Sequence, residues 1–381
     1  MNRTDIQQHE PPELRPGVAL AMVVVAMAVL GALVAGVFFA AMRDLRDGRD
    51  SISRVRALAA AEHGLELALA PGRWQSDWNT SSIRGLLASW PYDPGSGTSD
   101  TVQIWKLTSN SFLVTSSAAA GSGLVQASRR VSLLVALRAP RLTILGAATA
   151  RSEATIADES SISGFDAAPD QWICPPLADP IPALAIPAAS MVGTEECTTS
   201  PCLVGDVDVR ADSAAASADT YEQFGDIGRA AVVASAARLP GATVTITPAP
   251  SLNSSGECDH TEQRNMGDPL RLLGGSSGCA DYFPVLHAPG DLHISGGAGQ
   301  GFLLVDGDLT LDAGSQFFGA VVVRGSLSVS DGAEVHGAVL ASRISLDGAA
   351  RIQYSKCATN LALRAAAIPA VPPGQAWSEM Y

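Results

Sequence analysis

The sequence predicts three parts in order: a long N-terminal transmembrane α-helix, a small α+β unit, and a right- or left-handed parallel β-helix (β-solenoid) carrying a disulfide-rich insertion. Three observations predict this architecture. Residues 18–41 are uncharged, residues 71–140 contain short strand patterns separated by turns, and the region after Gly290 repeats every eighteen residues. The 36 glycines and 23 prolines among 381 residues favour strands and turns over a helical bundle.

These patterns also set the expected boundaries. The expected segments are a leader or cytoplasmic tail (1–17), a transmembrane and amphipathic helix (18–70), a small α+β meander (71–140), a first β-helix coil (141–166), a disulfide-rich insertion (167–289), further β-helix coils (290–354) and a C-terminal tail (355–381). The formal net charge of −13 argues against a nucleic-acid partner, because phosphate contacts require clustered cations.

The uncharged run is long enough to cross a membrane. Its 24 residues, at about 1.5 Å each, exceed a bilayer core of roughly 30 Å. It is too long for the apolar core of a cleaved signal peptide, and no small-x-small site follows it. Beyond it, an amphipathic pattern continues to Pro71-Gly72. Its apolar face is expected to contain Leu45, Ile52, Val55, Leu58, Glu62, Leu65 and Leu69, with Arg and Asp opposite.

The start of this helix carries a family signature. Gly17-Val18-Ala19-Leu20, followed by residues 60–66 (Ala-Ala-Glu-His-Gly-Leu-Glu), resembles the N-terminus of type IV pilins and type II secretion pseudopilins, and PilX-type pilus-assembly proteins in particular. The resemblance implies that a prepilin peptidase cuts between Gly17 and Val18, and that the helix then packs beside other pilin helices. Major pilins have Glu five residues after the cut, where this chain has Met22, which implies a minor subunit.

The side of the membrane on which the C-terminal part lies is predicted differently by two signals. Arginines dominate after the apolar run, and the positive-inside rule then predicts a cytoplasmic C-terminal part. Those flanking residues are Arg3 and Arg15 before the run, and Arg43, Arg46, Arg49, Arg54 and Arg56 after it, interleaved with Asp44, Asp47 and Asp50. Six cysteines after the run favour an oxidising compartment. With the pilin resemblance, we expect a single-pass protein of the bacterial inner membrane whose head is periplasmic or extracellular.

The small α+β unit is predicted from three strand patterns after the helix, namely Thr101–Leu107, Ser111–Ser117 and Arg130–Leu137. Short turns between them indicate an antiparallel meander. Nearby tryptophans are expected to pack this sheet against the helix rather than to stack on sugar. They are Trp74, Trp78 and Trp90.

The β-helix is predicted from the C-terminal repeat. Gly301–Val305, Gly319–Val323 and Gly337–Ala341 are eighteen residues apart. Segments 292–294, 309–311, 327–329 and 344–346 form a second repeat in phase with the first. Short strands of this kind bury an apolar face only by stacking on their copies. The segment 142–164 has similar spacing and is expected to form the first coil; the repeat also resembles, less specifically, the C-terminal part of larger PilX-type proteins.

The cysteines are expected to form disulfides rather than a metal site, because no C-x-x-C pair is present. Six cysteines allow fifteen pairings, and proximity along the chain selects one of them. The expected pairs are Cys197–Cys202, Cys258–Cys279 and Cys174–Cys357. Within the same insertion, Thr220 to Ala237 is expected to be helical.

We predict no metal, no cofactor and no enzymatic activity. The common hydrolase, metalloprotease and phosphate-loop motifs are absent from the sequence. Turn carboxylates and scattered histidines are interpreted as solvated surface groups rather than as calcium or transition-metal ligands. These residues are Asp306, Asp308, Asp312, His287, His293 and His336.

The leading hypothesis is a membrane-anchored minor pilin-like protein of type IV pilus or type II secretion assembly. Its expected partners are other pilin or pseudopilin subunits, the inner membrane and a prepilin peptidase. Two alternatives stay open. One is a cell-surface β-helical adhesin or polysaccharide-active enzyme, which would use Asp306, Asp308 and Arg324. The other is a membrane-tethered scaffold like the bactofilins, with a cytoplasmic head and reduced cysteines.

Overall fold

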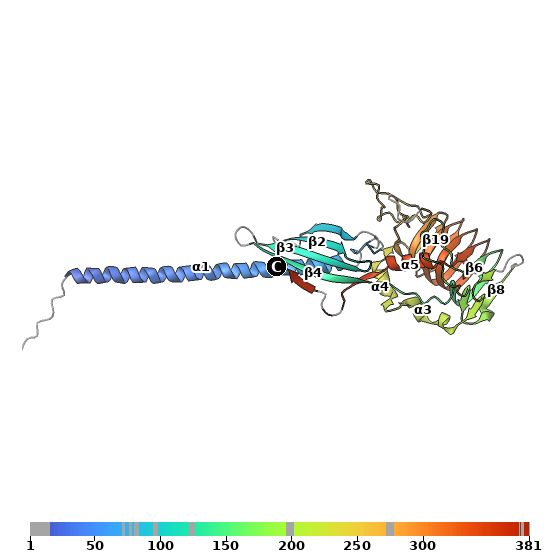
Figure 1. The fold of residues 1–381 in the computed structure, drawn as a ribbon, viewed down its shortest axis with the longest axis horizontal. Helices are drawn as coiled ribbons and strands as arrows, with labels where there is room; N and C mark the ends of the chain where they lie inside the picture. The colour runs from blue at the N-terminus through green and yellow to red at the C-terminus, as the bar shows by residue number, and fades with distance from the viewer. Residues whose placement is uncertain are drawn as a thin grey trace, which may run out of the picture.

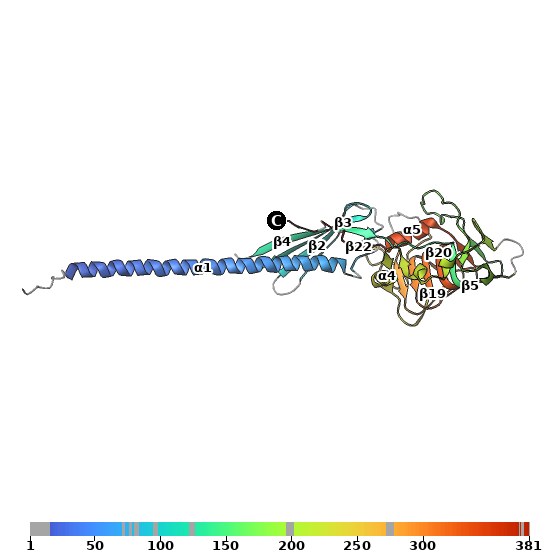
Figure 2. The same ribbon diagram turned by 90° about the horizontal axis from the view of Figure 1, so that it is seen from below.

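In the computed structural model, one long helix precedes a mostly β body (Figure 1). The structure describes residues 16–70, 73–75, 78–79, 84–93, 98–121, 126–195, 202–271, 278–372, 374 and 377–380. Helix α1 (Pro16–Leu69) projects as a single rod (Figures 1 and 2). An antiparallel sheet lies along the second half of α1, and a parallel sheet lies beyond it.

Helix α1 begins slightly earlier than the sequence predicts and is not interrupted by its glycines. It starts at Pro16 rather than Val18, which is favourable because the first helical residues need no amide donor. The predicted apolar face is wrong in its first half, where Leu45, Ile52 and Val55 are exposed, and at Glu62, which is exposed as well. Leu45 and Ile52 precede the part of α1 that meets the sheet, and Val55 lies beside buried Ser53 but is itself exposed. The buried positions lie at helical spacing and, apart from Leu65, are small: Ser53, Ala57, Ala60, Ala61, Gly64, Leu65 and Ala68.

The antiparallel sheet receives strands from both ends of the body. Its strands are β1 (Gly85–Tyr92), β2 (Thr98–Lys106), β3 (Ser111–Ala120), β4 (Ala127–Arg138), β22 (Ile368–Ala370) and β23 (Trp377–Met380). They are ordered β1-β2-β3-β4, and both C-terminal strands pair with β4. The tail expected at 355–381 is therefore part of this sheet. Strand β1 was missed because its apolar residues do not alternate regularly with polar ones.

The second sheet has fifteen strands, all paired in parallel. They are β5 (Ala148–Ile156), β6 (Ser161–Ser163), β7 (Leu184–Ile186), β8 (Val192–Thr194), β9 (Leu203–Val204), β10 (Val209–Ala211), β13 (Ala237–Arg238), β14 (Thr243–Ile246), β15 (Val285–Ala288), β16 (Asp291–Ser295), β17 (Ala298–Val305), β18 (Leu309–Asp312), β19 (Gln316–Val329), β20 (Glu334–Leu346) and β21 (Arg351–Gln353).

These strands form three rows. The first row is β13-β15-β17-β19-β20-β5-β7-β10, the second is β14-β16-β18-β19-β20-β5-β8, and the third is β17-β19-β20-β21-β6-β9. From β15 to β21, each strand pairs with its counterpart one repeat away. Leu303 pairs with Val321, which pairs with Val339, at the eighteen-residue spacing of the sequence.

The stacking order corrects two expected segments. Val339 of β20 pairs with Ala148 of β5, so the segment expected as the first coil stacks on the last one. The expected insertion, 167–289, contributes β7 to β10 at that end of the sheet and β13 to β15 at the other. Most of these strands are only two to four residues long, which is too short to show a period in the sequence.

Short elements cover the outer side of the first row. They are η3 (Ser213–Ala216), α3 (Ala218–Glu222), β11 (Gln223–Phe224), β12 (Ile227–Gly228), α4 (Arg229–Ser235) and α5 (Lys356–Ala365). A further short element, η2 (Ala189–Met191), lies beside β5 and β10. The helix expected at 220–237 is instead broken by the β11–β12 turn, where Gly225 has φ +74°. Outward side chains of the row pack with these elements in one core cluster, including Phe224, Phe302, Val322 and Leu363.

A column of glycines lets successive repeats approach one another. Gly301, Gly319 and Gly337 are aligned in register, with φ of +123°, +142° and +155°. A Cβ on Gly319 would lie 2.0 Å from the carbonyl oxygen of Gly301, and one on Gly337 would lie 1.7 Å from that of Gly319. Any side chain here would meet backbone, which cannot rotate away.

We therefore expect Gly319→Ala to destabilise the parallel sheet by about 2–3 kcal/mol, through steric overlap and an unfavourable φ. The matched control is Gly332→Ala, where φ is +71° but no atom lies within 4 Å of the added Cβ. It should cost only about 1 kcal/mol. Denaturant unfolding of the two variants measures the difference, and equal costs would contradict the steric account.

Candidate functional site: the exposed apolar helix and its attachment to the head

The first half of α1 exposes a continuous apolar surface. Its large side chains from Leu20 to Met42 are between 43% and 73% exposed, the highest being Phe39. Soluble proteins rarely leave an apolar surface of this size uncovered. In the described part of the chain, α1 is the one helix long and apolar enough to cross a membrane.

The second half of α1 is attached to the antiparallel sheet at close range. Beneath Gly64 lie Asp100 of β2 and Ser116 of β3, and the Ser116 hydroxyl donates to the Asp100 carboxylate at 2.8 and 2.9 Å. A Cβ on Gly64 would lie 2.1 Å from Asp100 Oδ2. Asp100 is only 3% exposed. The glycine is therefore required for the helix to cross above a buried carboxyl group.

Burial controls the charge of this carboxyl group. Desolvation raises the pKa of Asp100 above its ordinary 3.8, although hydrogen bonds from the Ser116 hydroxyl and from the Thr101 and Ser117 amides oppose the shift. The nearby imidazole of His63 opposes it as well.

A second polar contact joins the antiparallel sheet to the parallel one. The Asn79 amide donates to the carbonyl oxygens of Ala365 and Ala367, both at 2.8 Å, at the end of α5. Lys106 Nζ donates to the carbonyl oxygens of Trp78 and Asn79 at 2.8 and 3.1 Å. Burial, with a smaller contribution from the charge of Arg364, lowers the pKa of Lys106 to about 8. Asn79 thus joins the segment before β1 to the end of α5, and Lys106 joins the same segment to the end of β2, which we call the base of the antiparallel sheet.

The predicted tryptophans lie at this base. Trp74 contacts Trp78 and Phe112 with ring centroids 5.4 and 5.0 Å apart, and Trp78 stacks on Trp90 at 6.5 Å. All three belong to the core between α1 and the antiparallel sheet. Beside them is a cavity of about 460 Å³ between the two sheets.

The predicted processing residues occupy the start of α1. Gly17 and Val18 lie in its first turn, and Met22 is 69% exposed one turn later. The preceding residues 1–15 lie outside the described residues.

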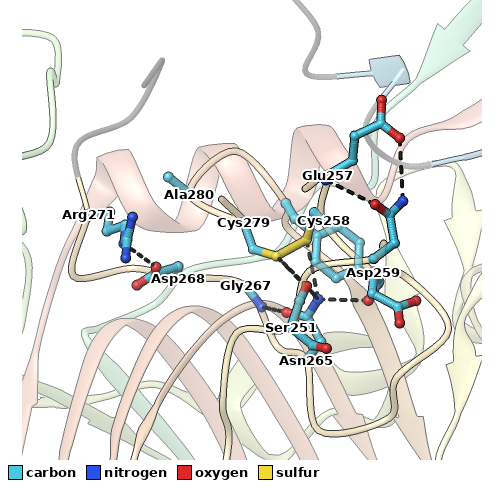
Figure 3. The surroundings of a disulfide bond; sticks show 12 residues. Ser251, Glu257, Cys258, Asp259, Asn265, Gly267, Asp268, Arg271, Cys279 and Ala280 are labelled. Atoms are coloured by element: carbon cyan, nitrogen blue, oxygen red, sulfur yellow. Dashed lines mark hydrogen bonds and ion pairs between the residues drawn. A yellow bond between two sulfur atoms is a disulfide. The ribbon is translucent and has the colours of Figure 1, made fainter. Parts of the chain in front are cut away.

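The structure joins Cys174 to Cys357 and Cys258 to Cys279. The first bond ties the segment after β6 to α5. The second closes a loop in which the Asn265 amide donates to the carbonyl oxygens of Ser251 and Asp259 at 3.2 and 2.7 Å (Figure 3). Cys202 is disulfide-bonded, and Cys197 lies outside the described residues.

Of the residues proposed for polysaccharide chemistry, Asp306 and Arg324 are in contact, and both are held in further ion pairs. Asp306 accepts from Arg229 at 2.8 Å and from Arg324 at 3.2 Å, and His287 Nε2 lies 2.8 Å from it. Burial would raise the pKa of Asp306, but the hydrogen bonds from His287 and Arg229 outweigh it and lower the pKa. Arg324 also makes two 2.7 Å bonds to Glu222 of α3. These ion pairs hold α3 and α4 on the first row.

The remaining predicted polar residues are separated along the parallel sheet. Asp308 accepts from the Ser326 amide at 2.7 Å, which holds one corner turn above another. Two histidines have acidic partners: His293 lies 2.7 Å from Asp312, and His336 lies 3.0 Å from Glu334. Among the described residues, no three His, Cys, Asp or Glu side chains are grouped as a metal site would require.

Sequence reasoning missed the residues that attach the helix: Gly64, Asn79, Asp100, Lys106 and Ser116. Lys106 had one usable signal, because it is one of two lysines in the chain and ends a strand pattern. Asp100 and Gly64 are 36 residues apart, and nothing in a single sequence links them.

No protein-family model and no curated protein matches this chain. Among solved structures, it is similar to the crystal structure of the competence-associated pilin ComZ from Thermus thermophilus. The match has 12% identity and a TM-score of 0.22, over 86% of this chain and 97% of that chain. A TM-score this low does not establish a common fold, so we argue function from the residues of this chain.

The contact at Gly64 predicts a contrast between two glycines of α1. Gly64→Ala should destabilise the packing of α1 on the sheet by about 2 kcal/mol, because the added methyl group overlaps Asp100. Gly48→Ala, where no atom lies within 4 Å, should instead stabilise by about 1 kcal/mol through helix propensity. Denaturant unfolding of the full chain in detergent, followed by tryptophan fluorescence, measures both. A neutral Gly64→Ala would contradict the close approach.

The buried carboxyl group predicts a pH-dependent stability difference. Because the folded-state pKa of Asp100 is raised, its ionised form opposes folding at neutral pH, and this penalty disappears as pH falls from the raised value towards 3.8. Asp100→Asn should therefore gain stability relative to wild type at pH 7 and lose that advantage near pH 3.8. Unfolding free energies measured across this range test the sign, and a pH-independent difference would contradict it.

Proposed function

We propose that this chain is a membrane-anchored, pilin-like structural subunit. The observation that carries the proposal is the contrast within α1, whose first half is apolar and exposed while its second half is packed on a sheet. Because the helix is continuous, it holds the folded head at a fixed position relative to its apolar first half, which would pack in lipid or against other helices. PilX-type proteins and other pilin-like subunits share this arrangement in outline, and the proposal covers the wider class.

We further propose that the parallel sheet of the head is a β-helix. Support comes from its three rows, from the pairing of strands β15 to β21 with copies 17 or 18 residues away, and from its apolar interior. Interior side chains from all three rows form one core cluster, including Ile294, Val321, Val335 and Ile352. This pattern is the expected result of coiling short strands around a common core.

An exported head is supported by the disulfides. The bonds Cys174–Cys357 and Cys258–Cys279 suit the periplasm or cell surface, whereas the cytoplasmic scaffold alternative requires thiols. The enzyme alternative gains no support from Asp306 and Arg324, which are engaged in ion pairs with α3 and α4.

Membrane partition of the full chain tests the anchor. Wild type should stay with membranes after alkaline extraction. Val29→Arg with Leu33→Arg should release much of it, because each mid-membrane arginine costs about 2.5–3.5 kcal/mol. The control, Ile52→Arg with Val55→Arg, adds the same charge at exposed positions beyond the apolar run and should not release the protein.

Co-expression with a prepilin peptidase tests the pilin-like identity. We expect a shortened chain beginning at Val18, and Gly17→Val should prevent the shortening. A wild-type chain that is extracted freely, or that the peptidase leaves intact, would overturn the corresponding part of the proposal.

A further inference from the structure

Directly after the apolar run, α1 carries two stripes of opposite charge. The arginine stripe is Arg43, Arg46 and Arg49, and the aspartate stripe is Asp44, Asp47 and Asp50. Each stripe recurs every three residues, and the two are offset by one residue. They therefore run side by side, about 100° apart around the helix and about 1.5 Å apart along it. Both follow the i±3 ridges along which helices pack against one another.

Asp44 and Asp47 cannot form an ion pair with a residue four positions later in their own helix. The positions four residues after them hold Gly48 and Ser51, which carry no charge. Three residues away along each stripe the neighbour has the same charge, which is unfavourable in an isolated helix. Among the described residues, Asp50 is the aspartate of the stripe that makes an ion pair, and its partner is Arg54.

An arginine that precedes an aspartate by four residues is also poorly placed to form an ion pair with it. Arg43 precedes Asp47 by four residues, and a cation placed before its anion is the weaker orientation on a helix. Among the described residues, no ion pair includes Arg43, Arg46, Arg49, Asp44 or Asp47. All five residues are exposed, and the first buried residue of α1 after them is Ser53.

We propose that the double stripe sets the register between two copies of this chain. The arginine stripe of one helix lies against the aspartate stripe of a second, parallel copy. The inference rests on the proposed function, since a shared membrane would align the two apolar runs in depth. Such a contact uses different surfaces on the two partners, so it leaves one stripe free on each outer side and can be continued by another subunit. The charges provide specificity, and the apolar runs provide affinity.

Charge reversal of one stripe at a time tests the pairing. The acidic variant carries Arg43→Asp, Arg46→Asp and Arg49→Asp. The basic variant carries Asp44→Arg, Asp47→Arg and Asp50→Arg. The swapped variant carries all six changes and keeps the net charge of wild type. The control variant, Asp208→Arg with Arg210→Asp, exchanges exposed charges on the parallel sheet.

Energy transfer between labelled full-length copies in phosphatidylcholine vesicles measures self-association. Each single-stripe variant should associate about tenfold more weakly than wild type, because three exposed pairs become repulsive. An equal mixture of acidic and basic variants should associate again, and the swapped and control variants should match wild type. High salt should weaken the wild-type contact.

The proposal would be overturned if either single-stripe variant self-associated as strongly as wild type. It would also be overturned if the mixture of acidic and basic variants associated no more strongly than each variant alone. Binding of the arginine stripe to lipid would also overturn the proposal. The acidic variant would then self-associate as wild type does, but would bind less than wild type to vesicles containing phosphatidylglycerol. Failure of the proposed membrane anchor gives a different result, because the wild-type chain itself would then not partition into vesicles.

Discussion

The rest of the structure depends on the packing of the second half of α1 against the antiparallel sheet. Small residues on that face, and Gly64 above Asp100 in particular, let the helix lie close to β2 and β3. Because α1 is continuous, fixing its end fixes the direction of the whole rod. The apolar half then has no internal partner among the described elements, and we propose that lipid or another helix covers it.

Segments from the start and from the C-terminal end of the body join the two sheets. Strands β22 and β23 follow the parallel sheet in sequence but pair with β4, and Asn79 binds the carbonyl end of α5. The parallel sheet is closed in a similar way, because β5 pairs with β20. Both sheets thus require contacts between residues nearly two hundred or more positions apart, which makes folding of the head dependent on slow, non-local pairing.

The strongly periodic parts of the molecule were predictable and the rest were not. The apolar run, strands β2 to β4 and the repeat from Gly301 follow directly from residue patterns several residues long. Strands such as β7 and β9, with three and two residues, are fixed by the neighbours on which they stack, and no local pattern marks them. The helix face was misread because Leu45, Ile52 and Val55 suggest burial but lie before the interface or point away from it, whereas most buried positions of the interface are alanine or glycine. The attachment site was invisible for the same reason, since Asp100 and Gly64 matter only as a pair.

The apolar run of α1 and the charges directly after it have different effects on packing between helices. A run of valine, alanine and leucine binds another such run well, but it specifies neither rotation nor vertical position, because every turn offers a similar surface. Exposed charge pairs contribute little affinity, yet a like-charge mismatch is penalised. Placing six charges immediately beyond the apolar run therefore adds register to a contact whose strength comes from elsewhere. The rigid join at Gly64 would transmit that register to the head, so that neighbouring heads are spaced by the helix and not by contacts of their own.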